Sequence, residues 1–196
     1  MALMSKEKPL KKQRKGKALP VIRYPDPILS QVSVEVAVQD EDPRALLSFI
    51  RDLVATMRAA EGVGLAAIQV GIPKRILVFD DSDAADNPRA LINPRIVWAG
   101  DEVETHDEGC LSFPGLYAPV VRPTTVRVEA LNEHGTPILY EGEGLLARVL
   151  QHEIDHLNGL TFVQRAAPEV RKAALREYFD LGNPVSASDP ADNNSK

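Results

Sequence analysis

The chain has 196 residues, 44% of them apolar, which fits one globular domain with a full-sized core. Its net charge of −5 gives the body of the protein no broad basic surface, so we expect no DNA partner. No apolar run reaches membrane-spanning length, and the single cysteine, Cys110, excludes an intrachain disulfide and suits a reducing compartment. We therefore expect a soluble, cytoplasmic monomer with no membrane contact.

The two ends of the chain differ from the body between them. Residues 1–20 hold seven Lys or Arg, all within residues 6–17, against one acidic residue. They lack the apolar core of a secretory signal and the pattern of a transit peptide. We predict a disordered basic arm here, which either only solubilises the protein or contacts RNA, as on a ribosome. Residues 183–196 are small and polar and predict a disordered tail, so the expected catalytic domain is 21–182.

Helical signals come first along the body. The stretch YPDPILS predicts a turn and a short helical start, because its prolines restrict the backbone. Asp42 and Pro43 then fit the N-cap and first residue of a helix. Apolar residues follow at helical spacing and predict an amphipathic helix to about residue 60: Leu46, Leu47, Ile50, Leu53, Val54 and Met57.

From residue 75 onward the pattern changes to short β-rich runs. These are RILVF, ALINPRIVW, EVETHDEG, TTVRVEAL and TPILYE, separated by turn residues. The stretch EGLLARVLQHEIDHLNG predicts a helix that Asn158 and Gly159 end, TFV a last strand, and PEVRKAALREYFDLG a last helix from Pro168. The predicted fold class is α+β, with antiparallel β-sheets packed around the central H-E-x-x-H helix and with N-terminal and C-terminal helices.

The stretch QHEIDHLNG places His152 and His156 four residues apart on that helix, so both can hold one metal ion. Glu153 lies beside them, on a stripe next to theirs, where a buried carboxylate needs a partner or a task. The histidine stripe is Leu145, Val149, His152 and His156; the neighbouring stripe is Leu146, Leu150, Glu153 and Leu157; Arg148, Gln151 and Asp155 fall on a more polar side.

Catalytic metal sites generally need three protein ligands, so a third is expected. A zinc peptidase is the first hypothesis, but its third ligand normally lies downstream, and no His or Cys follows His156. Upstream, Cys110 stands in DEGCLSFPG, at the end of a predicted strand and before a Pro-Gly turn. A lone cysteine is more often a small buried apolar residue, but a helix that lacks a third ligand favours the thiolate.

The stretch GVGLAA, residues 62–67, matches a dinucleotide-binding glycine pattern but not its context. A helix instead of a strand precedes Gly62, and Gly71 and Pro73 leave no room for the helix that should follow. We interpret the stretch as a loop that either is a plain turn or lines a reaction centre. In the second case Gln69 offers a neutral N–H donor for a developing oxyanion.

Three stretches together resemble the ordered motifs of peptide deformylases: GVGLAAIQVG (62–71), EGCLSFPG (108–115) and QHEIDHLNG (151–159). The resemblance runs from about Val21 to Arg165. It implies removal of the formyl group from the N-terminal formyl-methionine of nascent polypeptides. It also implies a divalent metal held by Cys110, His152 and His156, with Fe²⁺ as the usual ion, although Zn, Ni or Co would suit the same ligands.

The same resemblance implies roles for other residues. Metal-bound hydroxide would attack the formyl carbon, with Glu153 as general acid and base, while Gln69 and the backbone N–H of Leu111 hold the oxyanion. Two groups would bind substrate: the backbone of Val63, Gly64 and Gly109 would pair with an extended peptide, and Leu145, Val149 and His106 would line the methionine pocket.

Glu108 is expected to pair with Arg122 and hold the strand of Cys110, the alternative being that Glu108 is itself a ligand. Two rival functions remain for the whole chain. One is an H-E-x-x-H metallopeptidase, and the other is a catalytically silent deformylase-like binding protein. The second is disfavoured because Glu153, Gln69 and all three ligand candidates are present.

Overall fold

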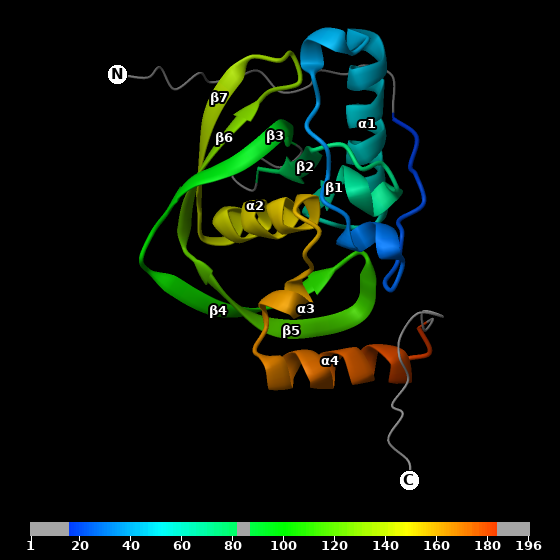
Figure 1. The fold of residues 1–196 in the computed structure, drawn as a ribbon, viewed down its shortest axis with the longest axis vertical. Helices are drawn as coiled ribbons and strands as arrows, with labels where there is room; N and C mark the ends of the chain where they lie inside the picture. The colour runs from blue at the N-terminus through cyan, green and yellow to red at the C-terminus, as the bar shows by residue number, and fades with distance from the viewer. Residues whose placement is uncertain (1–15, 82–86, 184–196) are drawn as a thin grey trace.

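The computed structural model describes residues 16–81 and 87–183. They form an α+β fold with two antiparallel sheets (Figure 1). The larger sheet has the strand order β1-β2-β3-β6-β7, and the smaller one is the pair β4-β5. The strands are β1 (Gly64–Ala66), β2 (Ile76–Asp80), β3 (Pro88–Ala99), β4 (Val103–Cys110), β5 (Phe113–Pro123), β6 (Thr125–Leu131) and β7 (Pro137–Glu143). The helices are α1 (Pro43–Ala59), α2 (Gly144–Leu157), α3 (Phe162–Arg165) and α4 (Pro168–Asp180), with the 3-10 turns η1 (Pro27–Ser30), η2 (Val38–Asp40) and η3 (Ala67–Val70).

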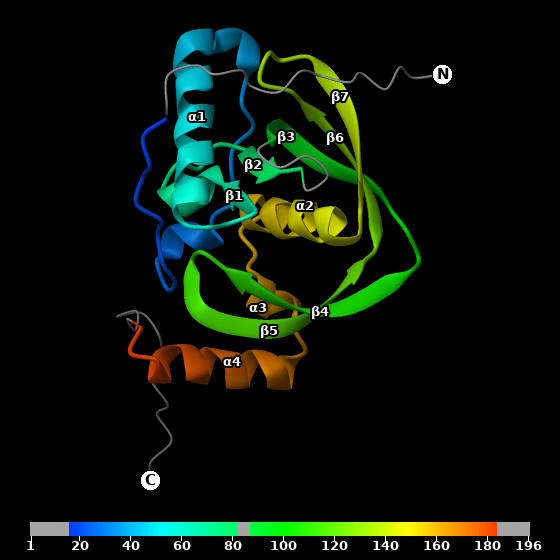
Figure 2. The ribbon, with the colours of Figure 1, turned by 180° about the vertical axis from the view of Figure 1, so that it is seen from behind.

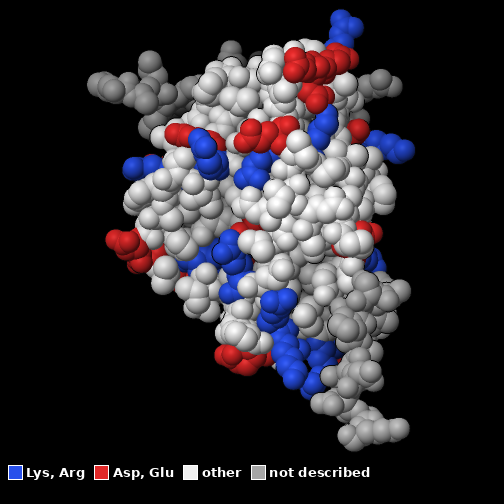
Figure 3. Space-filling model, in the orientation of Figure 1, with Lys and Arg blue, Asp and Glu red and all other residues white. Residues whose placement is uncertain are grey.

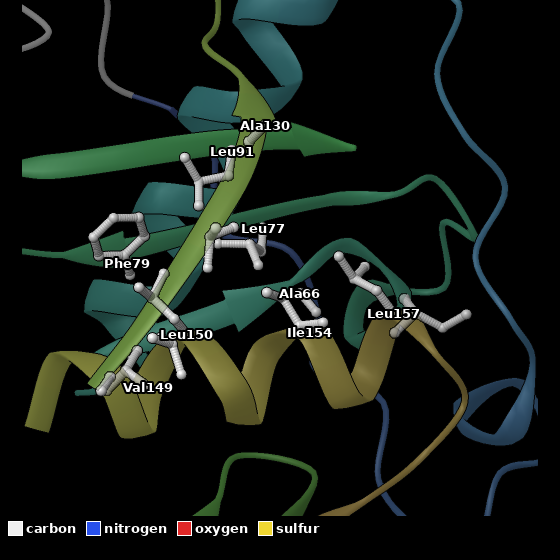
Figure 4. Packing of buried hydrophobic residues seen from close by; sticks show 13 residues of the cluster. Ala66, Leu77, Phe79, Leu91, Ala130, Val149, Leu150, Ile154 and Leu157 are labelled. Atoms are coloured by element: carbon white, nitrogen blue, oxygen red, sulfur yellow. The ribbon is translucent and has the colours of Figure 1, made fainter. Parts of the chain in front are cut away.

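Strand β2 shows why the larger sheet carries a helix on each face. Side chains alternate along a strand, and four consecutive residues of β2 are fully buried. Ile76 and Val78 pack against α1, whereas Leu77 and Phe79 pack against α2. Figure 2 shows the strands β1 and β2 between the two helices, and Figure 4 shows the α2 side of this core. The face of α2 toward the sheet is therefore held by apolar packing.

Helix α2 lies between the two sheets, with β4-β5 on its other side in both ribbon views (Figures 1 and 2). An aromatic cluster seals the far side of β5, where Phe113 lies 5.4 Å from both Phe162 of α3 and Tyr178 of α4, measured between ring centroids. The hydroxyl of Tyr178 donates to the carbonyl oxygen of Tyr24 at 2.8 Å. The N-terminal and C-terminal segments thus meet on the same hairpin.

Several expected elements are confirmed at their boundaries. Asp42 caps α1 by accepting from the backbone N–H of Arg44, and Pro43 is its first residue. Helix α2 ends at Leu157 with Asn158 as its C-cap, and Gly159 follows with a φ of +72°. At Gly159 a Cβ would lie 2.6 Å from the carbonyl oxygen of Ser30, so the position requires glycine for close approach as well as for its backbone angle.

Two local predictions are wrong. The stretch TFV is no strand: Thr161 precedes the short helix α3, whose first turn closes when Gln164 accepts from the N–H of Thr161 at 2.7 Å. Pro114 and Gly115 do not form the turn after Cys110 either, because β5 already begins at Phe113. The chain instead reverses at Leu111 and Ser112, next to a register shift between Gly109 and Cys110.

The predicted arm and tail fall mostly outside the described residues. The part of the arm that is described lies along α1: the N–H of Lys17 donates to Asp52 at 2.7 Å, and that of Leu19 to Thr56 at 2.9 Å. Asn183, the described start of the tail, donates to the carbonyl oxygen of Tyr178. None of the described helices combines the length and the apolar character needed to cross a membrane. In Figure 3, basic side chains gather over α4, and both signs of charge are interspersed elsewhere on that face.

Candidate metal centre

The structure brings the three expected ligands together. His152 and His156 project from successive turns of α2, with ring centroids 5.0 Å apart, and Cys110 comes from the end of β4. The sulfur of Cys110 lies 3.2 Å from Nε2 of His156. One donor atom from each residue falls within 4.8 Å of the other two, a spacing that allows one ion to bind all three.

The charge environment of the two histidines differs. Burial lowers the pKa of His152, but hydrogen bonds to Cys110 and Glu108 outweigh it and raise this pKa to about 10. Burial and the nearby charge of His152 lower the pKa of His156. Within the described chain, Nδ1 of His156 is buried with no hydrogen-bond partner. A metal ion would compete with the proton on His152, and a donor set of one sulfur and two imidazole nitrogens fits a divalent transition metal.

Glu108 joins this centre to a buried ion network. Its Oε2 lies 2.9 Å from Nδ1 of His152, which leaves Nε2 of that ring for a metal. Arg122 grips the same carboxylate with two N–H groups, at 2.6 and 2.9 Å, and donates to Asp155 at 2.7 Å. Arg165 also donates to Asp155. The expected pair of Glu108 with Arg122 is confirmed, and it orients a ligand candidate as well as a strand.

Glu153 lies beside the ligand candidates but, unlike Glu108, forms no ion pair with an arginine in the described part of the chain. Burial raises its pKa to about 7, against the opposing charge of His152. Its Oε2 is buried and meets no hydrogen-bond partner among the residues that are described. A Cβ at Gly64 would lie 2.6 Å from Oε1 of Glu153, so β1 passes the carboxylate closely only because that position is glycine. The carboxyl group is thus buried, has a pKa close to neutral pH, and keeps one oxygen available to bond a substrate.

Gln69 holds an amide over the same centre. It belongs to η3, and its Oε1 accepts from the N–H of Ala66 at 2.8 Å, which fixes the direction of its Nε2. That Nε2 lies 3.5 Å from the sulfur of Cys110 and 3.3 Å from the hydroxyl of Ser112. The backbone N–H of Ile22 donates to the carbonyl oxygen of Gln69 at 2.8 Å, so the segment before η1 supports it.

A cavity of about 760 Å³ opens onto these groups. Its lining contains Val63, Gly64, Gln69, Gly109, Cys110, Leu111, Leu145, Val149, His152 and Glu153. The prediction that His106 lines the cavity is wrong: this residue is exposed and pairs with Glu104 at 3.0 Å.

The sequence also placed Gln151 and Asp155 on a polar side of α2, but both are buried. Gln151 donates to the carbonyl oxygens of Pro123 and Ala147, each at 2.9 Å. Asp155 is neutralised by two arginines that lie 33 and 10 residues away in the chain. Sequence reasoning missed these partners, and the only available signal was an acidic residue on a helix with apolar residues around most of its circumference.

The fold, and a cysteine–histidine group beside a buried carboxylate, define a metal-dependent hydrolase. The polypeptide deformylase family matches residues 18–172. The peptide deformylase of Rhizobium meliloti is 44% identical over 81% of this chain and 91% of its own length, and peptide deformylase 1 of Ralstonia nicotianae is 47% identical over 76% and 87%. The chain belongs to the polypeptide deformylase family, and the resemblance in its motifs is confirmed.

Solved structures agree with this assignment. A peptide deformylase from Legionella pneumophila has a TM-score of 0.76 at 39% identity, covering 84% of this chain and 95% of that protein. A peptide deformylase from Synechococcus elongatus, in complex with actinonin, has a TM-score of 0.76 at 38% identity, covering 86% and 92%. The expected α+β fold class is therefore confirmed.

Proposed function

We propose that this protein removes the formyl group from the N-terminal formyl-methionine of nascent polypeptides. One observation carries the proposal: Cys110, His152 and His156 converge next to the buried carboxyl of Glu153, at a cavity bordered by two strand edges. An extended chain end can reach this point, and a formyl group is small enough to enter a crowded centre. Membership of the family supports the same activity.

The metal is proposed to be Fe²⁺, held by Cys110, His152 and His156. Zinc, nickel or cobalt would also suit one thiolate and two imidazoles. A bound divalent ion would act as a Lewis acid and lower the pKa of water at the site. Glu108 would keep Nε2 of His152 directed at the ion by holding its Nδ1 at 2.9 Å.

Glu153 is proposed to move the proton. Its pKa of about 7 lets the carboxyl group accept a proton from water and return it to the leaving amine near neutral pH. Its unpartnered Oε2 leaves room for a water molecule or a substrate amide without breaking a bond inside the protein. Glu153 therefore serves the reaction as an acid and a base and need not be a ligand.

The oxyanion that develops on the formyl group is proposed to lie between Gln69 and Leu111. Nε2 of Gln69 points to the centre because Ala66 fixes the other end of the amide. The backbone N–H of Leu111 follows the ligand candidate Cys110 directly, at the turn between β4 and β5. Two fixed donors of this kind stabilise a negatively charged intermediate without reorganising during the reaction.

The peptide is proposed to bind as an added strand. Strand β1 is an edge of the larger sheet, and β4 pairs on only one side, so Val63, Gly64 and Gly109 offer backbone groups at two facing edges. At Gly109 a Cβ would lie 2.6 Å from the ring of Tyr117, so a side chain there would require the Tyr117 ring to move. Leu145 and Val149 would contact the methionine side chain.

Nascent formylated chains emerge from ribosomes, so we place the protein in the cytoplasm and expect it to act as a monomer. The basic residues 6–17 could contact ribosomal RNA, since clustered Lys and Arg concentrate a protein near phosphate. Most of this segment lies outside the described residues, and the proposal rests on its charge alone.

The test is an assay of protein prepared without oxygen, with metal content and formate release measured together. A formyl-Met peptide should release formate, whereas an unformylated peptide with an internal cleavable bond should stay intact. Cleavage of the second peptide would favour an H-E-x-x-H metallopeptidase. Metal binding without either reaction would favour a silent binding protein.

The ligand assignment is tested by Cys110→Ser. A hydroxyl is a much weaker ligand than a thiolate, so this variant should lose most of its bound metal and its activity with it. Metal analysis after gel filtration measures the loss. A Cys110→Ser protein with full metal content and full activity would contradict the assignment.

A further inference from the structure

One wall of the cavity carries a cation. Arg148 lies one turn after Leu145 on α2 and lines the cavity with it, next to Val149 and Glu108. The side chain of Arg148 is only 11% exposed. The other charged side chains that line the cavity away from the ligand candidates are exposed: Arg23, Glu61 and Asp107. Arg148 is therefore the charged group that a substrate side chain would meet in a largely dry environment.

The guanidinium of Arg148 is held in place by three acceptors. Its Nη1 donates to Oε1 of Glu108 at 2.6 Å and to the carbonyl oxygen of Val120 at 2.9 Å. Its Nη2 donates to the carbonyl oxygen of Glu104 at 2.8 Å. A guanidinium has five N–H donors, so Nε–H and one N–H of Nη2 have no acceptor among the described residues. They are available to a ligand, because the side chain also lines the cavity.

The charge of Arg148 is only partly neutralised. Glu108 is shared with Arg122, which takes both of its oxygens, and Asp155 is shared between Arg122 and Arg165. Two carboxylates thus face three guanidinium groups in this network, and His152 shares Glu108 as well, so the cations outnumber the carboxylates. A partly buried cation with unused N–H groups is stabilised by an oxygen acceptor and is poorly solvated by an apolar side chain.

We infer that Arg148 is a specificity-determining residue, which lets the cavity accept a first residue whose side chain ends in an oxygen acceptor at about the length of methionine. Methionine sulfoxide and glutamine have this chemistry. The inference rests on the proposed function, because it concerns the side chain of the same formylated residue. It predicts that oxidation of the N-terminal methionine does not block deformylation by this protein.

A purely structural role for Arg148 makes a different prediction. Arg148 touches Glu108, which in turn touches His152, so its loss could disturb the metal centre. Such a disturbance would lower metal content and lower kcat for every substrate by the same factor. A specificity role changes the ratio of kcat/KM between substrates instead, mainly through KM.

The experiment compares three formyl peptides that differ only in their first residue: methionine, methionine sulfoxide and norleucine. Each is assayed with the metal-loaded wild-type protein and with Arg148→Leu. Arg127→Leu is the matched control, because Arg127 is exposed and pairs with Glu141 away from the cavity. Wild type should process the sulfoxide about as well as norleucine or better. In Arg148→Leu the sulfoxide-to-norleucine ratio of kcat/KM should fall roughly tenfold, the usual effect of one hydrogen bond to a charged group.

An unchanged ratio in Arg148→Leu, or an equal loss for all three peptides together with lower metal content, would overturn the inference. Wild-type protein that rejects the sulfoxide while processing methionine would overturn it too. Failure of wild type on all three peptides is a separate outcome and would overturn the proposed function instead. The ratio in Arg127→Leu should match that of wild type.

Discussion

Two groups of polar side chains lie on the same helix, α2, and they differ in whether their polar atoms have hydrogen-bond partners within the protein. Gln151 and Asp155 face protein partners and make all their contacts inside the chain. Glu153 and His156 are equally buried, yet each keeps an atom with no hydrogen-bond partner within residues 16–81 and 87–183. Buried polar atoms are normally satisfied, so the second group marks where the molecule bonds to something outside itself.

The difference separates residues that stabilise the fold from residues that serve chemistry. The satisfied group, with Arg122 and Glu108, fixes α2 against β4-β5. In the unsatisfied group, Oε2 of Glu153 is open to a water molecule or a substrate, and His156 turns its Nε2 toward the sulfur of Cys110, where a metal would bind. Changes in the first group should therefore lower stability, and changes in the second should lower activity.

The largest expected effect is on turnover in Glu153→Ala. Removing the proton carrier should lower kcat by about 10²- to 10⁴-fold, while all three ligand candidates remain and metal content stays at the wild-type level. Thermal unfolding should not show a comparable loss, because Oε2 of Glu153 has no hydrogen-bond partner among the described residues and the carboxyl group costs free energy to bury. Loss of metal in step with activity would show that Glu153 belongs with the ligands.

The next effect is on stability in Arg122→Met. Arg122 is 4% exposed and contacts Glu108 and Asp155, so its loss leaves two buried carboxylates short of a partner. The free energy of unfolding should fall by about 3–5 kcal/mol in urea titrations. The control is Arg127→Met: its exposed pair with Glu141 should contribute less than about 1 kcal/mol.

This stability difference should depend on pH. Burial alone would raise the pKa of Glu108, but hydrogen bonds to His152 and Arg122 hold it well below its usual range. A carboxyl group with a lowered folded-state pKa stabilises the fold above its unfolded-state pKa and loses that contribution as pH falls. The gap between wild type and Arg122→Met should therefore be full at neutral pH and narrow below about pH 4. A gap that widens in acid would contradict the role of this pair.

A smaller effect is expected in Gln151→Met, next to the ligand candidate His152. The side chain keeps its volume but loses the N–H groups that bond Pro123 and Ala147. Unfolding free energy should fall by about 1–3 kcal/mol, while kcat and metal content stay unchanged. A large loss of kcat with normal stability would show that the satisfied group also takes part in the reaction.

The roles of the unsatisfied group could be predicted from the sequence, whereas the partners of the satisfied group could not. The ligand candidates and Glu153 lie in short motifs, where spacing on a helix alone places them on adjacent stripes. Apart from Ala147 on α2 itself, the partners of Asp155 and Gln151 come from β5 and from the chain after α2, and no local pattern indicates such distant contacts. The same limit explains Arg148, whose side chain reaches two strands that lie 28 and 44 residues earlier.

The fold shows the same division. Helix α1 and the strands with clear alternation could be predicted, because their apolar residues repeat with the period of the element. The structure of the run TFV could not be predicted, since three apolar or β-branched residues fit a strand and a helical turn equally well. Gln164 decides the matter by capping Thr161, and the packing of Phe162 against Phe113 holds the turn in place.

The smallest effect on catalysis is expected from deleting residues 1–15. The cut is placed there because Lys17 and Leu19 already bond to α1. The deleted segment carries six Lys or Arg and one Glu, a net charge of +5, and none of the residues proposed to act in catalysis or to bind metal or substrate. Hydrolysis of a short formyl-Met peptide should stay unchanged.

Co-sedimentation with ribosomes should weaken at low salt, and the difference should fade as salt rises, because phosphate contacts release counterions. Deletion of residues 184–196, a segment of similar length with two Asp and one Lys, is the matched control and should not change co-sedimentation. If the protein without residues 1–15 sediments as well as the full chain at low salt, the basic segment has no role in binding the ribosome.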